Sequence, residues 1–212
     1  AVSLISGGID SPVAAYRIMQ RGCRLIFVHF HSAPYLDKSS QEKVRELVKL
    51  LTRHQFASRL YLVPFGEIQR QIVAAVMRPL RVVLYRRMMM RIAEAIAKKE
   101  KASALVTGES LAQVASQTLE NLAVIEKAAT LSILRPLVGM DKQEIIDQAR
   151  RIGTFETSCI PDQDCCQLFV PRHPATKARL ADVEEAESRL DLAGLIQLGV
   201  EKAEVEEFRF PD

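Results

Sequence analysis

The stretch LISGGIDSPVAAY, residues 4–16, decides the fold, because a glycine-rich turn here joins an apolar run to a helical pattern. Residues 1–5 are an apolar run typical of a short buried strand, and apolar residues after Pro12 recur at helical spacing. The first N–H groups of a helix lack partners within the helix and carry partial positive charge. Gly7 and Gly8 let the chain turn tightly and let an anion approach the backbone. The stretch therefore predicts an anion-binding loop between the first strand and the first helix.

Strand and helix patterns alternate along the rest of the chain. Strands are expected over residues 24–30, 59–63, 104–107 and 133–135, and helices over 40–53, 66–77, 80–99 and from Asp141, which forms a capping box with Glu144. This order predicts an α/β fold with a doubly wound parallel sheet of about five strands and helices on both faces. Such sheets bind ligands beyond the C-terminal strand ends, where the strand order switches. The opening loop, residues 29–30 and residues 107–108 all follow strands, which predicts one shared crevice.

Composition bounds the class of protein. The 212 residues are 48% hydrophobic and 26% charged, which is typical of a soluble globular protein with one sizeable core. No apolar run approaches the ~20 residues of a membrane helix, and no basic leader precedes the first strand, so a cytoplasmic protein without membrane contact is expected. A net charge of +3 does not by itself indicate nucleic acid. We expect residues 1–178 to form the nucleotide-binding domain and residues 179–212 to add a helix and a short strand.

The glycine-rich loop differs from the commonest nucleotide motifs. It lacks the lysine of a P-loop and the glycine spacing of a dinucleotide fingerprint. Residues 6–11, SGGIDS, instead resemble the pyrophosphate-binding loop of ATP-pyrophosphatases, which release pyrophosphate and leave AMP on their substrate. A turn that only connects strand to helix is the alternative. Asp10 needs its own explanation, since a carboxylate repels phosphate unless a cation lies between them. A Mg²⁺-linked or catalytic role and a helix-capping role are both open.

The stretch TGESLAQVASQTLENL, residues 107–122, is unusually polar. We expect the stretch to be helical, which places Gln113 and Gln117, four residues apart, on one face, with Ser110 three residues before Gln113. A solvated helix face is the alternative. The position of the stretch directly after an expected strand favours contact with a ligand.

At this point the chain resembles the catalytic domain of tRNA 4-thiouridine synthetases, also called tRNA sulfurtransferases. The matching stretches are SGGIDSPVA, RGCRLIFVHFHS, YRRMMMRIAEAIA, TGESLAQVASQTLENL, LRPLVGMDKQEII and CCQLFVPRHPATK, and they cover nearly the whole chain in order. The resemblance implies an adenine nucleotide alpha hydrolase-like fold. It also implies a reaction in which ATP adenylates O4 of uridine 8 in tRNA, pyrophosphate leaves, and persulfide sulfur displaces AMP. A role in thiamine thiazole synthesis is implied as well.

The loop chemistry and the resemblance together give a set of expected ligand contacts. ATP and Mg²⁺ are the expected cofactors, and the residues expected to contact ATP are Leu4, Ile5, Ser6, Gly7, Gly8, Asp10, Ser11, His29, Phe30, Arg86, Gly108 and Gln117. His29 is interpreted as part of the nucleotide wall rather than as a general base. The expected partners are tRNA and a cysteine desulfurase or other sulfur donor, and a homodimer is one assembly considered. Domains that bind tRNA are expected upstream of this chain.

Five arginines lie at helical spacing: Arg78, Arg81, Arg86, Arg87 and Arg91. We assign Arg86 to an ATP phosphate and the others to the tRNA backbone, with a solvated helix face as the alternative. The three methionines of residues 88–90 are expected to fill the core or a groove.

Three of the four cysteines cluster at Cys159, Cys165 and Cys166, without the Cys-x-x-Cys spacing of a zinc knuckle. No metal ligands are therefore assigned, and Cys23 is expected in the core. In family members with a rhodanese domain, a cysteine at the position of Cys166 resolves a disulfide with the rhodanese thiol. The residues after PATK predict no such domain here, so Cys166 or Cys165 is expected to carry persulfide, and together with Asp10 they are the expected catalytic residues. A cluster that receives free sulfide is the alternative.

Two other functions remain open at this stage. One is an ATP-pyrophosphatase that adenylates another tRNA base or a small carbonyl substrate. The other is a non-catalytic adenine-nucleotide sensor, which would need neither a leaving-group loop nor clustered thiols.

Overall fold

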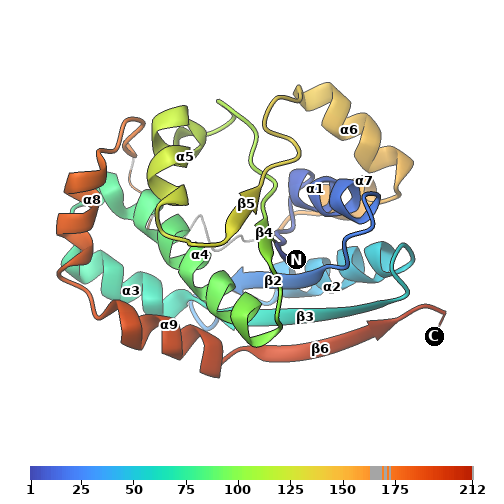
Figure 1. The fold of residues 1–212 in the computed structure, drawn as a ribbon, viewed down its shortest axis with the longest axis horizontal. Coiled ribbons are helices and arrows are strands. Elements are labelled where there is room, and N and C mark those ends of the chain that lie inside the picture. Colours follow the sequence, from blue (N-terminus) through green and yellow to red (C-terminus); the bar gives the residue numbers. More distant parts are fainter. Residues whose placement is uncertain (163–168, 170, 172, 212) are drawn as a thin grey trace.

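A computed structural model describes residues 1–162, 169, 171 and 173–211, and its centre is one six-stranded sheet (Figure 1). The strands are β1 (Val2–Leu4), β2 (Ile26–His31), β3 (Ala57–Pro64), β4 (Ala104–Val106), β5 (Ser132–Leu134) and β6 (Glu204–Arg209). Their order is β5-β4-β1-β2-β3-β6. The first five strands pair in parallel, which confirms the expected α/β sheet, and β6 adds an antiparallel edge along β3.

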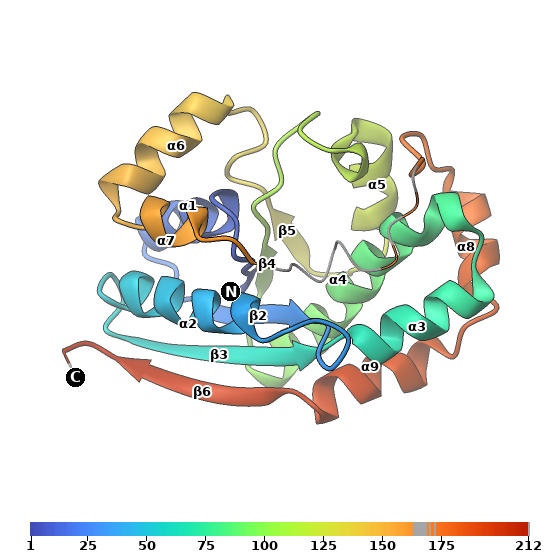
Figure 2. The same cartoon turned by 180° about the vertical axis from the view of Figure 1, so that it is seen from behind.

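Helices cover both faces of the sheet, as the alternating order of elements predicted (Figures 1 and 2). One face carries α1 (Asp10–Met19), α2 (Ser39–Thr52), α6 (Lys142–Arg151) and α7 (Phe155–Cys159). The other face carries α3 (Gly66–Ala75), α4 (Arg81–Lys99), α5 (Leu119–Glu126), α8 (Leu180–Glu187) and α9 (Leu192–Glu201). Across the described ranges, no helix is long and apolar enough to cross a membrane.

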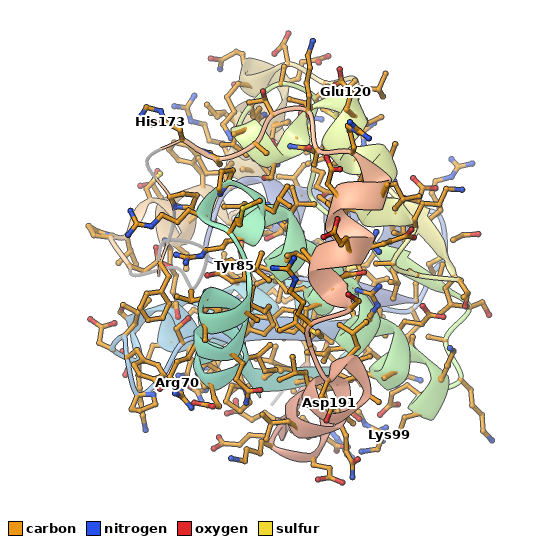
Figure 3. All side chains as sticks on the ribbon, turned by 90° about the vertical axis from the view of Figure 1, so that its left-hand side faces the viewer. Arg70, Tyr85, Lys99, Glu120, His173 and Asp191 are labelled. Atoms are coloured by element: carbon orange, nitrogen blue, oxygen red, sulfur yellow. The ribbon has the colours of Figure 1, made fainter. Side chains whose placement is uncertain are left out.

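The core has two layers because successive strand residues point to opposite faces of the sheet. In β3, Leu60 and Leu62 pack with α1 and α2, while Tyr61 and Val63 pack with α3 and α4. The expected burial of residues 88–90 is confirmed, since all three methionines of α4 lie in the second layer. Figure 3 looks onto the α3, α8 and α9 side of this layer.

The strand order places a switch point beside β1. The chain runs from β1 to β2 and β3 on one side, then crosses to β4 and β5 on the other. The loop after β1 and the segment after β4 therefore meet at the C-terminal edge of the parallel strands, where doubly wound sheets bind ligands.

Two expectations about local structure are wrong. The polar stretch after β4 is not a helix up to residue 118: it is an irregular segment with a short 3₁₀ turn at Ala115–Gln117. Helix α5 begins only at Leu119, because Thr118 caps it and accepts the N–H of Asn121 at 3.2 Å. The C-terminal part has two helices where one was expected, and Asp191, labelled in Figure 3, caps the second by accepting the N–H of Gly194 at 2.9 Å.

Candidate functional site

A cavity of about 640 Å³ opens at the C-terminal ends of the parallel strands. It is lined by the loop after β1, the end of β2, one face of α4 and the segment after β4. Of the residues expected to contact ATP, all but Gly7 line this cavity. Small-molecule sites usually enclose about 300–1,000 Å³, so the cavity has the size of a nucleotide site.

The loop after β1 is closed by its two serines. Ser11 Oγ accepts the N–H of Ser6 at 2.8 Å and lies 3.2 Å from Ser6 Oγ, which in turn accepts the N–H of Gly8 at 3.3 Å. The loop is packed tightly against the segment after β4, since a Cβ on Gly108 would lie 2.7 Å from Ser11 N and Cα. Glycine is therefore required at position 108 for the two cavity walls to meet.

Asp10 has a lysine partner that the sequence did not reveal. Lys142 Nζ, from the start of α6, donates to Asp10 Oδ1 at 2.6 Å. The predicted capping box of Asp141 and Glu144 is present and holds the first turn of α6 next to the loop. The residue at the N-cap of α1 is Ile9 rather than Asp10. Lys142 thus places a positive charge beside Asp10 at the loop, and its signal in the sequence was the lysine in the stretch LRPLVGMDKQEII.

A buried carboxylate, also missed from the sequence, holds the arginine side of the cavity. Glu109 is 2% exposed and accepts hydrogen bonds on Oε2 from Arg135 Nε at 2.8 Å and from Thr107 Oγ1 at 3.0 Å. Its Oε1 lies 3.7 Å from Arg86 Nη1. Arg86 therefore reaches the cavity with a fixed carboxylate behind it. The signal in the sequence was the acidic residue next to Gly108 in the stretch TGES.

The two histidines at the end of β2 are both buried. His29 Nδ1 lies 3.0 Å from the carbonyl oxygen of Ile5, and its Nε2 lies 3.4 Å from Ser40 Oγ, so the ring connects the residue after β1 to α2 at the cavity wall. Burial, together with the charges of His29, Arg45 and Lys38, lowers the pKa of His31 to about 4. His31 is therefore neutral near pH 7 and accepts the N–H of Ala33 at 3.3 Å.

Several cavity side chains fit a ligand rich in hydrogen-bonding groups. Among the described residues, Glu109 Oε1, Gln113 Nε2 and Gln117 Oε1 are buried without a hydrogen-bond partner, and all three residues line the cavity. Leaving such a group unpaired costs about 1–3 kcal/mol, so a bound ligand that pairs with them is favoured. A nucleotide has the donors and acceptors to do so. No cluster of three metal-binding side chains occurs in the described part of the chain, and the carboxylates among the residues that line the cavity are Asp10 and Glu109.

The assignment of the arginine run to tRNA is wrong for Arg87 and Arg91. Arg87 is buried and donates to both oxygens of Glu187 at 2.7 and 2.8 Å, and Arg91 donates to the same carboxylate at 2.6 and 3.0 Å. Arg81 donates to the carbonyl oxygens of Val73 and Val76 at 3.0 and 3.3 Å. These arginines hold helices together.

The cysteine predictions have mixed outcomes. Cys165 and Cys166 lie outside the described residues, so their assignment stays a prediction. Cys159 is exposed at the end of α7. Cys23 is exposed after α1, so its expected place in the core is wrong.

A mostly parallel sheet with a serine-closed glycine loop at its switch point and a nucleotide-sized cavity defines an α/β domain of the adenine nucleotide alpha hydrolase-like class. Comparison with known proteins narrows this class. The family model described as thiamine biosynthesis protein (ThiI) matches residues 1–192, and the chain belongs to the ThiI family.

Relatives and solved structures agree with this assignment. The chain is 55% identical over 210 residues to a probable tRNA sulfurtransferase of Thermus thermophilus, an alignment that covers 99% of this chain and 52% of the relative. A probable tRNA sulfurtransferase of Acetivibrio thermocellus is 50% identical over 205 residues, and this alignment covers 97% of this chain and 52% of the relative. A crystal structure of a 4-thiouridine synthetase–RNA complex with bound ATP superimposes with a TM-score of 0.94 at 40% identity, covering 99% of this chain and 55% of that one. The NMN synthetase of Francisella tularensis shares the fold alone. It is 14% identical and superimposes with a TM-score of 0.60, and the match covers 95% of this chain and 83% of that one. The chain spans about half the length of the curated relatives it matches.

Proposed function

We propose that this chain is the ATP-using domain of a tRNA sulfurtransferase that converts uridine 8 of tRNA to 4-thiouridine. The observation that carries the proposal is the cavity, whose walls contain nearly all of the residues expected to contact ATP. The relatives described as tRNA sulfurtransferases and the similar synthetase with RNA and ATP support the same activity. O4 of uridine is a poor leaving group. In the proposed reaction AMP is transferred to O4 with loss of pyrophosphate. The outer sulfur of a cysteine persulfide then attacks C4 as AMP leaves with the former O4. A second cysteine thiol breaks the resulting S–S bond, which releases 4-thiouridine and leaves a cysteine disulfide.

The proposal gives each cavity wall a role toward ATP. The N–H groups and hydroxyls of the loop, residues 6–11, bind the β- and γ-phosphates, and the positive end of α1 adds to the attraction. The ends of β1 and β2 form the adenosine wall. Arg86 and Gln117 contact the nucleotide from the other side. Asp10 would hold a Mg²⁺ ion together with the phosphates, and such an ion would lower the charge repulsion at the reacting phosphate.

The sulfur step is proposed for the late cysteines. Cys166, with Cys165 close by in the sequence, accepts persulfide sulfur from a cysteine desulfurase, and the cations at Arg172 and Lys177 favour the thiolate. We expect Cys166→Ser in the full-length protein to keep tRNA-dependent ATP turnover and to lose 4-thiouridine formation. Thiolation at the parental rate would give Cys166 a structural role, and stoichiometric iron with all three late cysteines required would replace persulfide by a cluster.

The test of the ATP step uses the full-length protein that contains this chain. Asp10→Ala should lower kcat for tRNA-dependent pyrophosphate release on the order of 10²–10³-fold, the usual cost of losing one group that stabilises transition-state charge, and should change ATP affinity much less. Asp147→Ala, which removes an exposed carboxylate from α6, is the matched control. Turnover of Asp10→Ala within a few-fold of the parent would contradict the proposed role. Absence of ATP binding by the parent protein would contradict the function as a whole.

A further inference from the structure

The loop after β1 has a second face at Gly7, which packs against α2 and α7. Gly7 is buried, and it is the loop glycine that does not line the cavity. Ser158 of α7 donates to the carbonyl oxygen of Gly8 at 3.4 Å, so α7 touches the loop directly. This second face of the loop holds a pair of charges that the proposed function does not explain.

The positive member of the pair is Lys43 of α2. Its side chain is only 5% exposed, and its Nζ donates to the carbonyl oxygen of Ile160 at 2.6 Å and to Asp162 Oδ1 at 3.1 Å. Lys43 Cδ lies 3.0 Å from the point that a Cβ on Gly7 would occupy. Lysine is almost never buried to this extent unless it is paired, because desolvation of its ammonium group is costly.

The negative member is Asp162, whose side chain is 16% exposed. Its second oxygen, Oδ2, lies against Gly7, in space that any side chain at position 7 would fill. A carboxylate thus sits on a loop built to attract anions, with an ammonium group directly beside it. This is the arrangement expected if the carboxylate takes the place of a phosphate group and the ammonium group of Lys43 can bind either anion.

We propose that Lys43 is a further pyrophosphate-binding residue, and that Asp162 holds its ammonium group only while the β- and γ-phosphates of ATP are absent. The inference rests on the proposed function, since it assigns these phosphates to the same loop. Phosphate and Asp162 are both anions and repel each other at close range, so the carboxylate leaves Lys43 as the phosphates arrive. Asp162 therefore competes with ATP for one cation.

Titration calorimetry of the full-length protein with ATP, pyrophosphate and AMP tests this assignment. Lys43→Met should weaken ATP and pyrophosphate binding on the order of 10- to 100-fold, as expected for loss of one hydrogen bond to a charged group. AMP binding should be unchanged, because AMP has no β- or γ-phosphate. Lys49→Met, which removes an exposed lysine from the same helix, is the matched control and should leave all three affinities unchanged.

Asp162→Asn gives the opposite result if the two anions compete. The amide keeps the size of the side chain and removes its charge, so ATP and pyrophosphate should bind several-fold more tightly while AMP binding stays the same. Lys43→Arg should restore most of the affinity that Lys43→Met loses, and unchanged AMP binding shows that each variant is folded.

Three outcomes overturn the inference. Equal ATP affinity of Lys43→Met and Lys49→Met, loss of AMP affinity in proportion to ATP affinity, or unchanged or weaker ATP binding by Asp162→Asn would each do so. If Lys43→Met fails to fold, Asp162→Asn alone decides the question. Failure of the parent protein to bind ATP would instead remove the proposed function on which the inference rests.

Discussion

Gly108 is the position where one added methyl group would change the site. The Cβ of an alanine would lie 2.7 Å from backbone atoms of Ser11, which cannot move without opening the loop. We expect Gly108→Ala to weaken ATP binding by about tenfold or more, since displacement of a preorganised site by about 1 Å can cost on the order of 10²-fold in rate. Calorimetry with ATP measures the effect. Gly139→Ala is the control, because nothing lies within 4 Å of its added Cβ, and equal affinities in the two variants would contradict the close fit of the two walls.

His31 makes stability depend on pH. Its pKa is lowered to about 4 in the folded protein by burial and nearby positive charges, whereas an unfolded histidine takes up its proton near pH 6.5. The unfolded state therefore binds more protons between these two values, and stability falls as the pH drops from about 6.5 to 4.

The size of this effect is on the order of 2 kcal/mol at pH 5 relative to pH 7. Denaturant unfolding of His31→Asn at both pH values should show a smaller loss than the parent protein, because the titrating group is gone. His173→Asn removes an exposed histidine, labelled in Figure 3, and should leave the loss unchanged. The same pH dependence in His31→Asn and the parent would place the titration elsewhere.

At the scale of elements, one carboxylate fastens α8 to α4. Burial raises the pKa of Glu187, but hydrogen bonds from Arg87 and Arg91 more than offset this, so its pKa lies below the usual value. Glu187→Gln leaves a buried Arg87 without its counter-charge, which should lower the free energy of unfolding by about 3–5 kcal/mol.

Urea unfolding of that variant is best compared with Glu185→Gln. Glu185 lies on the same helix and forms an exposed pair with Arg189, so its loss should cost less than about 1 kcal/mol. Similar losses in the two variants would mean that the buried pair contributes no more than a surface one.

The same helices show what the sequence could and could not predict. Strands and most helices were predicted within a few residues, because burial on one face imposes a period that is visible locally. Arg87 was misread because its partner, Glu187, lies 100 residues away in the sequence. The stretch after β4 was misread as a helix for a similar reason. Thr118 caps α5 and donates to the carbonyl oxygen of Thr176 at 2.6 Å, and Asn121 donates to that of Ala175 at 2.8 Å.

In the candidate site, too, the features carried by adjacent residues were predicted and the contacts between distant segments were not. Its nucleotide wall was predicted from motifs, because the loop and the strand ends carry their chemistry in adjacent residues. Its charge partners were not, since Lys142, Arg135 and Asp162 come to Asp10, Glu109 and Lys43 only through the packing of distant segments. Periodicity and motifs hold no information on such contacts. The cysteine assignment and the role of each ATP contact stay predictions.

At the scale of the whole molecule, the distribution of charge bears on tRNA binding. The net charge is only +3, and Arg81, Arg87 and Arg91 donate hydrogen bonds to other residues of this chain. Affinity for RNA at physiological salt depends on the number of phosphates that cations neutralise. Residues 1–212 alone should therefore bind tRNA weakly, with a dissociation constant no tighter than roughly 10⁻⁶ M, the range of non-specific binding.

Fluorescence anisotropy with labelled tRNA, for residues 1–212 and for a full-length protein, measures this difference. We expect at least tenfold tighter binding by the full-length protein, because the other half is proposed to recognise tRNA. Binding of an unrelated RNA hairpin by residues 1–212 should be comparable to that of tRNA. Tight binding by residues 1–212 that is selective for tRNA would show that this half recognises tRNA by itself.

Arg78 is the member of the arginine run that best keeps the proposed role toward tRNA, since it is exposed in the 3₁₀ turn Arg78–Leu80 before α4. In the full-length protein, Arg78→Ala should weaken tRNA binding several-fold and reduce the slope of log affinity against log salt by about one. ATP affinity should not change, because this residue does not line the cavity. Arg189→Ala, which removes an exposed arginine from the turn after α8, is the control. If both variants show the same slope of log affinity against log salt, Arg78 does not contact tRNA. The tRNA backbone would then have to be bound by other parts of the protein.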